Sequence, residues 1–107
     1  MAREIHGLID TGATVTIVNP QLAHSCKLPL IGTVSIHAAG HSGKYHEHLA
    51  SVSFPESDLE HFSYLRVVAC PIASKEVSCL IGRDILQHWE LRYNGMLGQF
   101  SIQDLRF

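Results

Sequence analysis

One stretch near the amino end of the chain constrains its fold most strongly. The apolar pair Leu8 and Ile9 leads into Asp10-Thr11-Gly12, and the β-branched run 14–18 follows. Residues of these kinds favour strands, whereas glycine favours a tight turn because it tolerates positive φ and close approach of another backbone. We therefore predict a buried strand, a turn that carries a carboxylate, and a second strand. Strands on both sides would give the Asp10 side chain a fixed position.

The bulk properties favour one folded domain over residues 1–107. Of 107 residues, 46% are hydrophobic and 17% are charged, which is typical of a globular protein. The net charge of −2 gives no electrostatic reason to expect nucleic acid or a membrane as a partner. The three cysteines are an odd number without paired spacing, so we expect reduced thiols in a cytoplasmic protein, with one disulfide as the less favoured alternative. They are Cys26, Cys70 and Cys79.

The rest of the chain predicts many short strands and one or two short helices. Asn19 and Pro20 suit the start of a helix over 21–26, as cap and first residue. Asn94-Gly95 is a strong signal for a hairpin turn. Strands are predicted at 33–38, 44–54, 62–70, 77–81, 90–93 and 97–102, with a second helix at 83–89. This pattern predicts an all-β domain that is closed or nearly closed.

Two motifs resemble those of the retroviral-type (retropepsin-like) aspartic proteases. The stretch from Ile9 to Thr14 resembles the active-site signature of that family, and the stretch from Cys79 to Leu86 resembles its late apolar-apolar-Gly motif and short helix. The motifs occur in the family's order, and the resemblance extends over residues 7–102. It implies a closed β-barrel, equivalent to half of a pepsin-like enzyme, that acts as an aspartic endopeptidase without a cofactor.

The chemistry of such an enzyme needs two carboxylates, one as general base and one as general acid. Only Asp10 is followed by Thr-Gly; Asp58, Asp84 and Asp104 are followed by neither Thr-Gly nor Ser-Gly. The second carboxylate must therefore come from a second copy across a two-fold axis. We expect a homodimer with a peptide or protein substrate.

The resemblance also implies roles for the residues around Asp10. Asp10 would be catalytic, although a turn aspartate is the alternative that its residue type alone favours. The Thr11 hydroxyl would brace the two active-site loops across the dimer, and Gly12 would bring its amide to the carboxylate. Ala13 would be small because substrate lies alongside. Gly82 would let the late strand cross close behind the Asp10 loop.

Arg83 corresponds to a family arginine that pairs with an acid just after the Asp-Thr-Gly-Ala turn. Thr14 occupies that place here. We therefore expect Arg83 either to find another partner or to be solvated. Asp84 suits a capping role at the start of the second helix.

The hairpin over 33–54 has a tip of small residues. By resemblance it is the flap that closes over substrate, and an ordinary surface hairpin is the alternative. The predicted substrate-binding residues of the flap are Ala38, Ala39, Gly40, His41 and Gly43.

Eight histidines are many for this length, and four of them surround the predicted hairpin. They are His37, His41, His46 and His48. His46 and His48 share one strand face and could form a metal site with His37. We favour a polar, pH-sensitive outer face without metal, whose protonation would alter flap mobility. The cysteines lack the setting of a nucleophile, so we expect them to be buried.

The six residues before Gly7 leave little room for the strand that usually opens a retropepsin-like domain. Because chain ends help to build the family's dimer interface, a second hypothesis remains open. In it, the protein is a catalytically weak or silent module for dimerisation or peptide binding.

Overall fold

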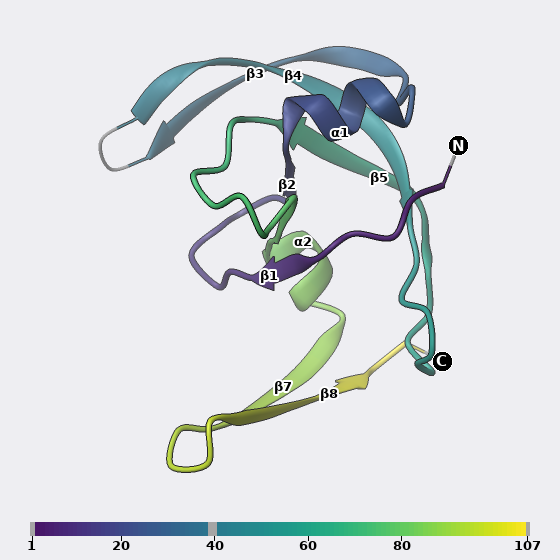
Figure 1. Ribbon diagram of the computed structural model, residues 1–107, viewed down its shortest axis with the longest axis vertical. Coiled ribbons are helices and arrows are strands. Elements are labelled where there is room, and N and C mark those ends of the chain that lie inside the picture. Colours follow the sequence, from purple (N-terminus) through teal and green to yellow (C-terminus); the bar gives the residue numbers. More distant parts are fainter. Residues whose placement is uncertain (1, 39–40, 107) are drawn as a thin grey trace.

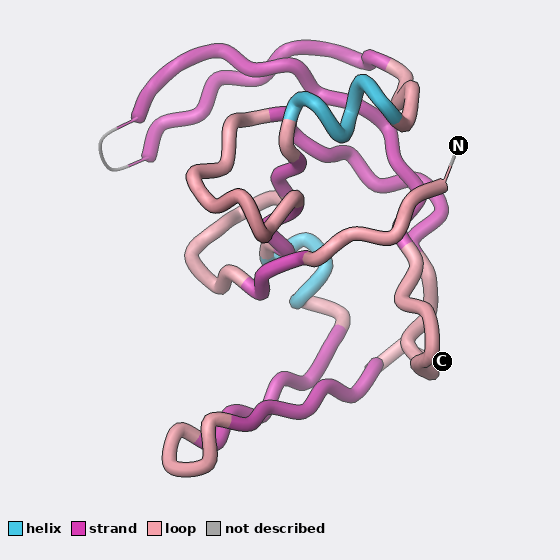
Figure 2. The backbone as a smooth tube through the Cα atoms, in the orientation of Figure 1, coloured by secondary structure: helices cyan, strands magenta, loops and turns pink. Residues whose placement is uncertain are grey.

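Two unequal sheets and two short helices make up the fold (Figure 1), in a computed structural model that describes residues 2–38 and 41–106. Strands predominate, and the two helices are short, with six and four residues (Figure 2), which confirms the predicted all-β class. Within the described ranges, no helix is long and apolar enough to cross a bilayer. The elements in order are β1 (Gly7–Ile9), β2 (Ile17–Val18), α1 (Pro20–Ser25), β3 (Leu30–Ala38), β4 (His41–Val52), β5 (Phe62–Ala69), β6 (Cys79–Ile81), α2 (Arg83–Leu86), β7 (Trp89–Asn94) and β8 (Gln99–Asp104).

The six-stranded sheet has the order β1-β6-β2-β5-β4-β3. Its β6 lies between β1, to which it is parallel, and β2, to which it is antiparallel. Because β1 and β6 run in the same direction, their carboxyl ends lie at the same edge. Asp10 directly follows β1, and Gly82 directly follows β6. The topology thus brings the two sequence motifs together.

The hairpin of β3 and β4 is the longest element pair, and it arches away from the rest of the sheet (Figure 1). Its register ends with Ala38 opposite His41. The predicted flap residues Ala39 and Gly40 lie outside the described residues. On its other side, β4 pairs with β5.

The main core lies between α1 and the six-stranded sheet. As predicted, Asn19 caps α1, because its side chain accepts a hydrogen bond from the Gln21 amide at 3.2 Å, and Pro20 is the first helical residue. The helix buries Ala23 against the sheet. Apolar residues of the sheet complete the buried cluster: Val18, Ala50, Val67, Ala69 and Cys79.

The second sheet is the hairpin of β7 and β8, which differs in two ways from the prediction. Trp89 opens β7 instead of ending a helix, so α2 stops at Leu86. Pairing continues to Asn94 opposite Gln99, so the loop is residues 95–98, whereas the predicted strands 90–93 and 97–102 placed the turn at residues 94–96. The Asn94 side chain accepts from the Leu97 amide at 3.2 Å. Gly98 then takes a φ of +62°, which suits glycine.

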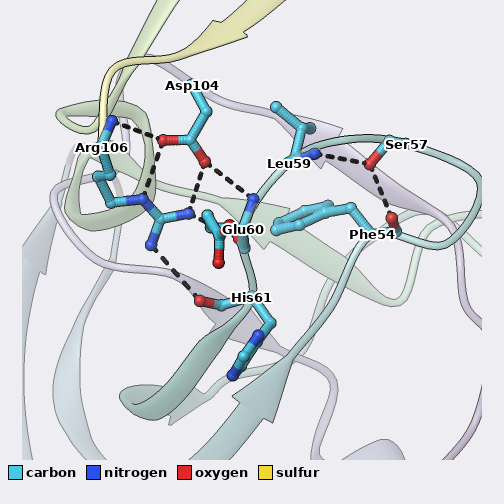
Figure 3. A network of polar contacts seen from close by, with 7 residues as sticks. All are labelled: Phe54, Ser57, Leu59, Glu60, His61, Asp104 and Arg106. Carbon is cyan, nitrogen blue, oxygen red and sulfur yellow. Dashed lines mark hydrogen bonds and ion pairs between the residues drawn. The ribbon is translucent and has the colours of Figure 1, made fainter.

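A polar network anchors the end of β8 to the segment before β5 (Figure 3). Asp104 accepts hydrogen bonds from the Arg106 guanidinium at 2.7 Å and from the Glu60 amide at 2.9 Å. The guanidinium also donates to the Glu60 carbonyl and lies 4.0 Å from the centre of the Phe62 ring. Hydrogen bonding to Arg106 holds the pKa of Asp104 well below its usual range.

Candidate active site

The Asp10 side chain is half-buried in a tight turn at the end of β1. The Asp10 amide donates to the Ile81 carbonyl at 3.0 Å, which ties the start of the turn to β6. One carboxylate oxygen accepts from the Gly12 amide at 3.0 Å, and the Asp10 carbonyl accepts from the Ala13 amide at 3.1 Å. A Cβ at Gly12 would lie 3.2 Å from that carboxylate oxygen, so glycine leaves the carboxylate room in this turn.

Gly82 passes directly behind the loop that carries Asp10. A Cβ on Gly82 would lie 2.5 Å from the carbonyl carbon and oxygen of Val15 and 2.9 Å from the Thr16 nitrogen. Real Cβ atoms essentially never approach backbone so closely, so only glycine fits here without a shift. The Gly82 amide donates to the Thr16 hydroxyl at 3.2 Å.

Arg83 holds the same loop from its exposed side. Its guanidinium donates to the Thr11 carbonyl at 2.9 Å and to the Thr14 hydroxyl at 3.2 Å. Its amide donates to the Ala13 carbonyl at 2.8 Å. Arg83 was expected either to find another partner or to be solvated, and the structure shows that it has other partners. The guanidinium is bound by the Thr14 hydroxyl, at the position where the resemblance implied an acid, and by the Thr11 carbonyl.

Asp84 does not occupy the helix N-cap, so the predicted capping role is wrong in this respect. The N-cap is Gly82, and Asp84 lies in the first turn of α2. One Asp84 oxygen accepts from the Thr16 hydroxyl at 2.7 Å and from the Ile85 amide at 2.9 Å, and the other accepts from the Thr16 amide at 3.0 Å. The carboxylate therefore joins α2 to the strand that leaves the Asp10 turn.

Thr16 is the site residue that the sequence interpretation missed. Its exposure is 0%, and its hydroxyl donates to Asp84 while it accepts from the Gly82 amide. The sequence did contain a signal for Thr16. In an extended segment Thr16 lies on the same face as Val18, which is buried, and this places its hydroxyl at an inward position. A buried hydroxyl needs partners, which here come from the late motif.

The structure places the remaining predicted residues at two points. Thr11 is exposed at the Asp10 turn, and Ala13 is half-buried there. Gly43 lies in β4 opposite Ile36. In the view of Figure 1, the ends of β3 and β4 and the loop after β1 lie on the same side of the molecule.

The histidines near the hairpin do not converge as the metal-site alternative requires. His37 is opposite Ser42, whereas His46 is opposite Thr33, farther along the hairpin. His46 and His48 stand edge to face with ring centres 6.4 Å apart. In the described part of the chain, no three His, Cys, Asp or Glu side chains form a cluster that could hold a metal ion.

Comparison with known families agrees with this geometry. Residues 2–88 match the sequence model of a family described as "gag-polyprotein putative aspartyl protease". The chain belongs to this family. The matched residues include both motifs and all contacts around Asp10, whereas the hairpin of β7 and β8 lies beyond them. Neither the curated proteins nor the solved structures compared with the chain gave a match.

Proposed function

We propose that this family member is an aspartic endopeptidase that cleaves extended polypeptides with a water molecule held between the Asp10 side chains of two copies. The observation that carries the proposal is the construction of the Asp10 turn. The Gly12 amide holds one carboxylate oxygen, Gly82 closes the turn from behind, and Arg83 binds it from outside. Such support gives a reactive group the fixed geometry that catalysis requires.

The reaction follows from two carboxylates that share one proton. Repulsion between them separates their titrations, so that one is ionised while the other is protonated. The ionised carboxylate takes a proton from water while the water oxygen attacks the peptide carbonyl carbon. The protonated carboxyl group gives its proton to the carbonyl oxygen. When the tetrahedral intermediate collapses, the carbon–nitrogen bond breaks and the carboxyl group that took the proton of water gives it to the leaving nitrogen. The other carboxylate takes a proton from a hydroxyl of the intermediate, so that the pair again shares one proton. One chain supplies one such carboxylate, so the proposal requires a homodimer.

The hairpin of β7 and β8 offers a surface for this dimer. Trp89, at the base of one face, is only 6% exposed and packs against Phe54. Toward the tip the same face carries Tyr93 opposite Phe100, which are 75% and 60% exposed. Exposed aromatic residues that continue a buried apolar face are typical of a protein–protein interface. We propose that the partner is the second copy of this chain.

A pair of matched substitutions tests this surface. Phe100→Asp places a charge in the proposed interface, and Tyr64→Asp places one on an exposed aromatic position of β5. Sedimentation over a dilution series should show a weaker dimer for Phe100→Asp and an unchanged dimer for Tyr64→Asp. An unchanged dimer in Phe100→Asp would contradict the role of the hairpin but leave the catalytic proposal intact.

Substrate would bind as an extended strand between the Asp10 turns and the flap. In this proposal the backbone of Ala38 to Gly43 pairs with the substrate, as in other cases of strand addition. Ala13 leaves space for the substrate chain. The Thr11 hydroxyl braces its equivalent in the second copy.

Cleavage of a denatured protein at acidic to neutral pH tests the activity. A statine-type transition-state mimic should block cleavage, and Asp10→Asn should abolish it. Adding an equal amount of Asp10→Asn protein should reduce wild-type activity to about half, because half of the wild-type chains then pair with inactive copies. Activity that survives Asp10→Asn would refute the proposal. A dimer that binds peptide without turnover would favour the silent-module hypothesis.

A further inference from the structure

An open cavity of about 620 Å³ lies between α1 and β4, lined in part by Pro20 and Pro71. Its volume is within the range of about 300–1,000 Å³ that is usual for small-molecule sites. None of the residues that line it belongs to the Asp10 turn. Neither the proposed reaction nor the family match gives this cavity a role.

The ionisable lysine and histidine side chains that line the cavity can carry positive charge alone. Its basic residues are His24, Lys27, Lys44, His46 and His48, and no Asp or Glu is among the described residues that line it. The nearest acid in sequence, Glu47, is not among the lining residues and is paired with Arg66 at 3.2 Å. In a chain of net charge −2, this is a local concentration of positive charge. Such a surface attracts anions.

The floor of the cavity is apolar, with Ala23, Leu28 and Ala69 in its lining. One ring of the rim is fixed, because His48 Nδ1 lies 3.0 Å from the Leu28 carbonyl oxygen and donates to it. Tyr45 also lines the cavity, and the adjacent Cys70 raises the pKa of its hydroxyl, so Tyr45 adds no negative charge. The cavity thus combines an apolar floor with a cationic rim.

We propose that this cavity binds a small organic anion, with its charged group at Lys27, Lys44 and His46 and its apolar group on the floor. A peptide strand is a poorer occupant at His46 and His48, because β4 is paired there with β3 on one side and with β5 on the other. The anionic group and the apolar group are both needed, since each matches a different part of the lining.

The proposal also predicts a dependence on pH. Histidine gains its positive charge between about pH 8 and 5, so binding tightens as the pH falls through this range. The groups that face the cavity are His24 from α1, His46 and His48 from β4, the two lysines, and Tyr45 with its neighbour Cys70.

Benzenesulfonate is a suitable probe, because its charge is constant over this range. Titration of the full chain, followed by amide NMR, should shift the resonances of Ala23, Leu28 and His46. Sulfate, which lacks the apolar group, and benzyl alcohol, which lacks the charge, should each bind at least about tenfold more weakly. Binding of benzenesulfonate should be tighter at pH 5.5 than at pH 8.

A double variant, Lys27→Gln with Lys44→Gln, should weaken benzenesulfonate binding by about tenfold. The matched control is Lys75→Gln, which removes an exposed lysine outside the cavity and should leave binding unchanged. The inference is overturned if benzenesulfonate causes no shifts at these residues. It is also overturned if benzyl alcohol binds equally well, or if the double variant binds like the control. None of these results depends on Asp10, so they leave the proposed protease activity standing.

Discussion

Gly82→Ala should be one of the most damaging single-methyl changes that this chain can receive. The added Cβ would lie 2.5 Å from the Val15 carbonyl, whereas ordinary contact begins at 3.4 Å, so the backbone must move by 3.4 − 2.5 = 0.9 Å. Movement of that size disturbs the bonds from the Gly82 amide to Thr16 and from the Arg83 amide to Ala13. Overpacking and these hydrogen bonds together predict a loss of about 3–5 kcal/mol in the free energy of unfolding.

Gly32→Ala is the matched control, because it adds the same methyl group to a strand. There the Cβ would lie 3.8 Å from its nearest neighbour, a Glu47 carboxylate oxygen, which is ordinary contact. The φ of Gly82 is −90°, so alanine is permitted by the backbone at that site, and space alone distinguishes the two. Urea unfolding at equal protein concentration should show Gly32→Ala within about 1 kcal/mol of wild type. Equal effects of the two substitutions would refute the close crossing behind Asp10.

Three further predictions concern single groups in the fold. Thr16→Val should lower the free energy of unfolding by about 2–4 kcal/mol, since it leaves the buried Gly82 amide without a partner and removes one of three hydrogen bonds to the Asp84 carboxylate. The exposed Thr14→Val should cost less than about 1 kcal/mol, and equal losses in the two variants would contradict the role of Thr16. Burial raises the pKa of Cys79 to about 11 from 9.0, so the free energy of unfolding of wild type should fall relative to that of Cys79→Ala as the pH rises from 9 to 11. Equal pH dependence of the free energy of unfolding in the two proteins would contradict this prediction. Because Arg106 lowers the pKa of Asp104, wild type should lose stability relative to Asp104→Asn as the pH falls below 3.8. Acid titrations followed by circular dichroism measure this loss, and equal acid stability of the two proteins would contradict a stabilising role for the Asp104–Arg106 pair.

Local patterns in the sequence were sufficient for much of the fold. The alternating strands and the Asn19-Pro20 helix start were predicted, because periodicity and capping act between near neighbours. The strand predicted over the run 14–18 was too long, since only Ile17–Val18 forms a strand, and the strand before Asp10 is exposed at Gly7 and Leu8 instead of buried. The Asp-Thr-Gly turn was also predicted, since glycine marks its position. The family match confirmed the resemblance that these residues carry.

Contacts between distant residues were beyond this kind of reasoning. Thr16 and Asp84 are 68 positions apart, and they meet only because β6 inserts between β1 and β2. The partners of Arg83 depend on the same crossing. The loop between β7 and β8 is longer than predicted because β8 begins at Gln99 and not at Leu97, and Gly98 takes a left-handed conformation just before it.

The most direct test of the central claim is the binding stoichiometry of a statine-type mimic, measured by calorimetry on the whole chain. If two copies form one site between their Asp10 side chains, one inhibitor molecule should bind for every two chains, and Asp10→Asn should weaken that binding. One inhibitor per chain would mean that each copy carries its own complete site, and the shared-carboxylate account would be contradicted.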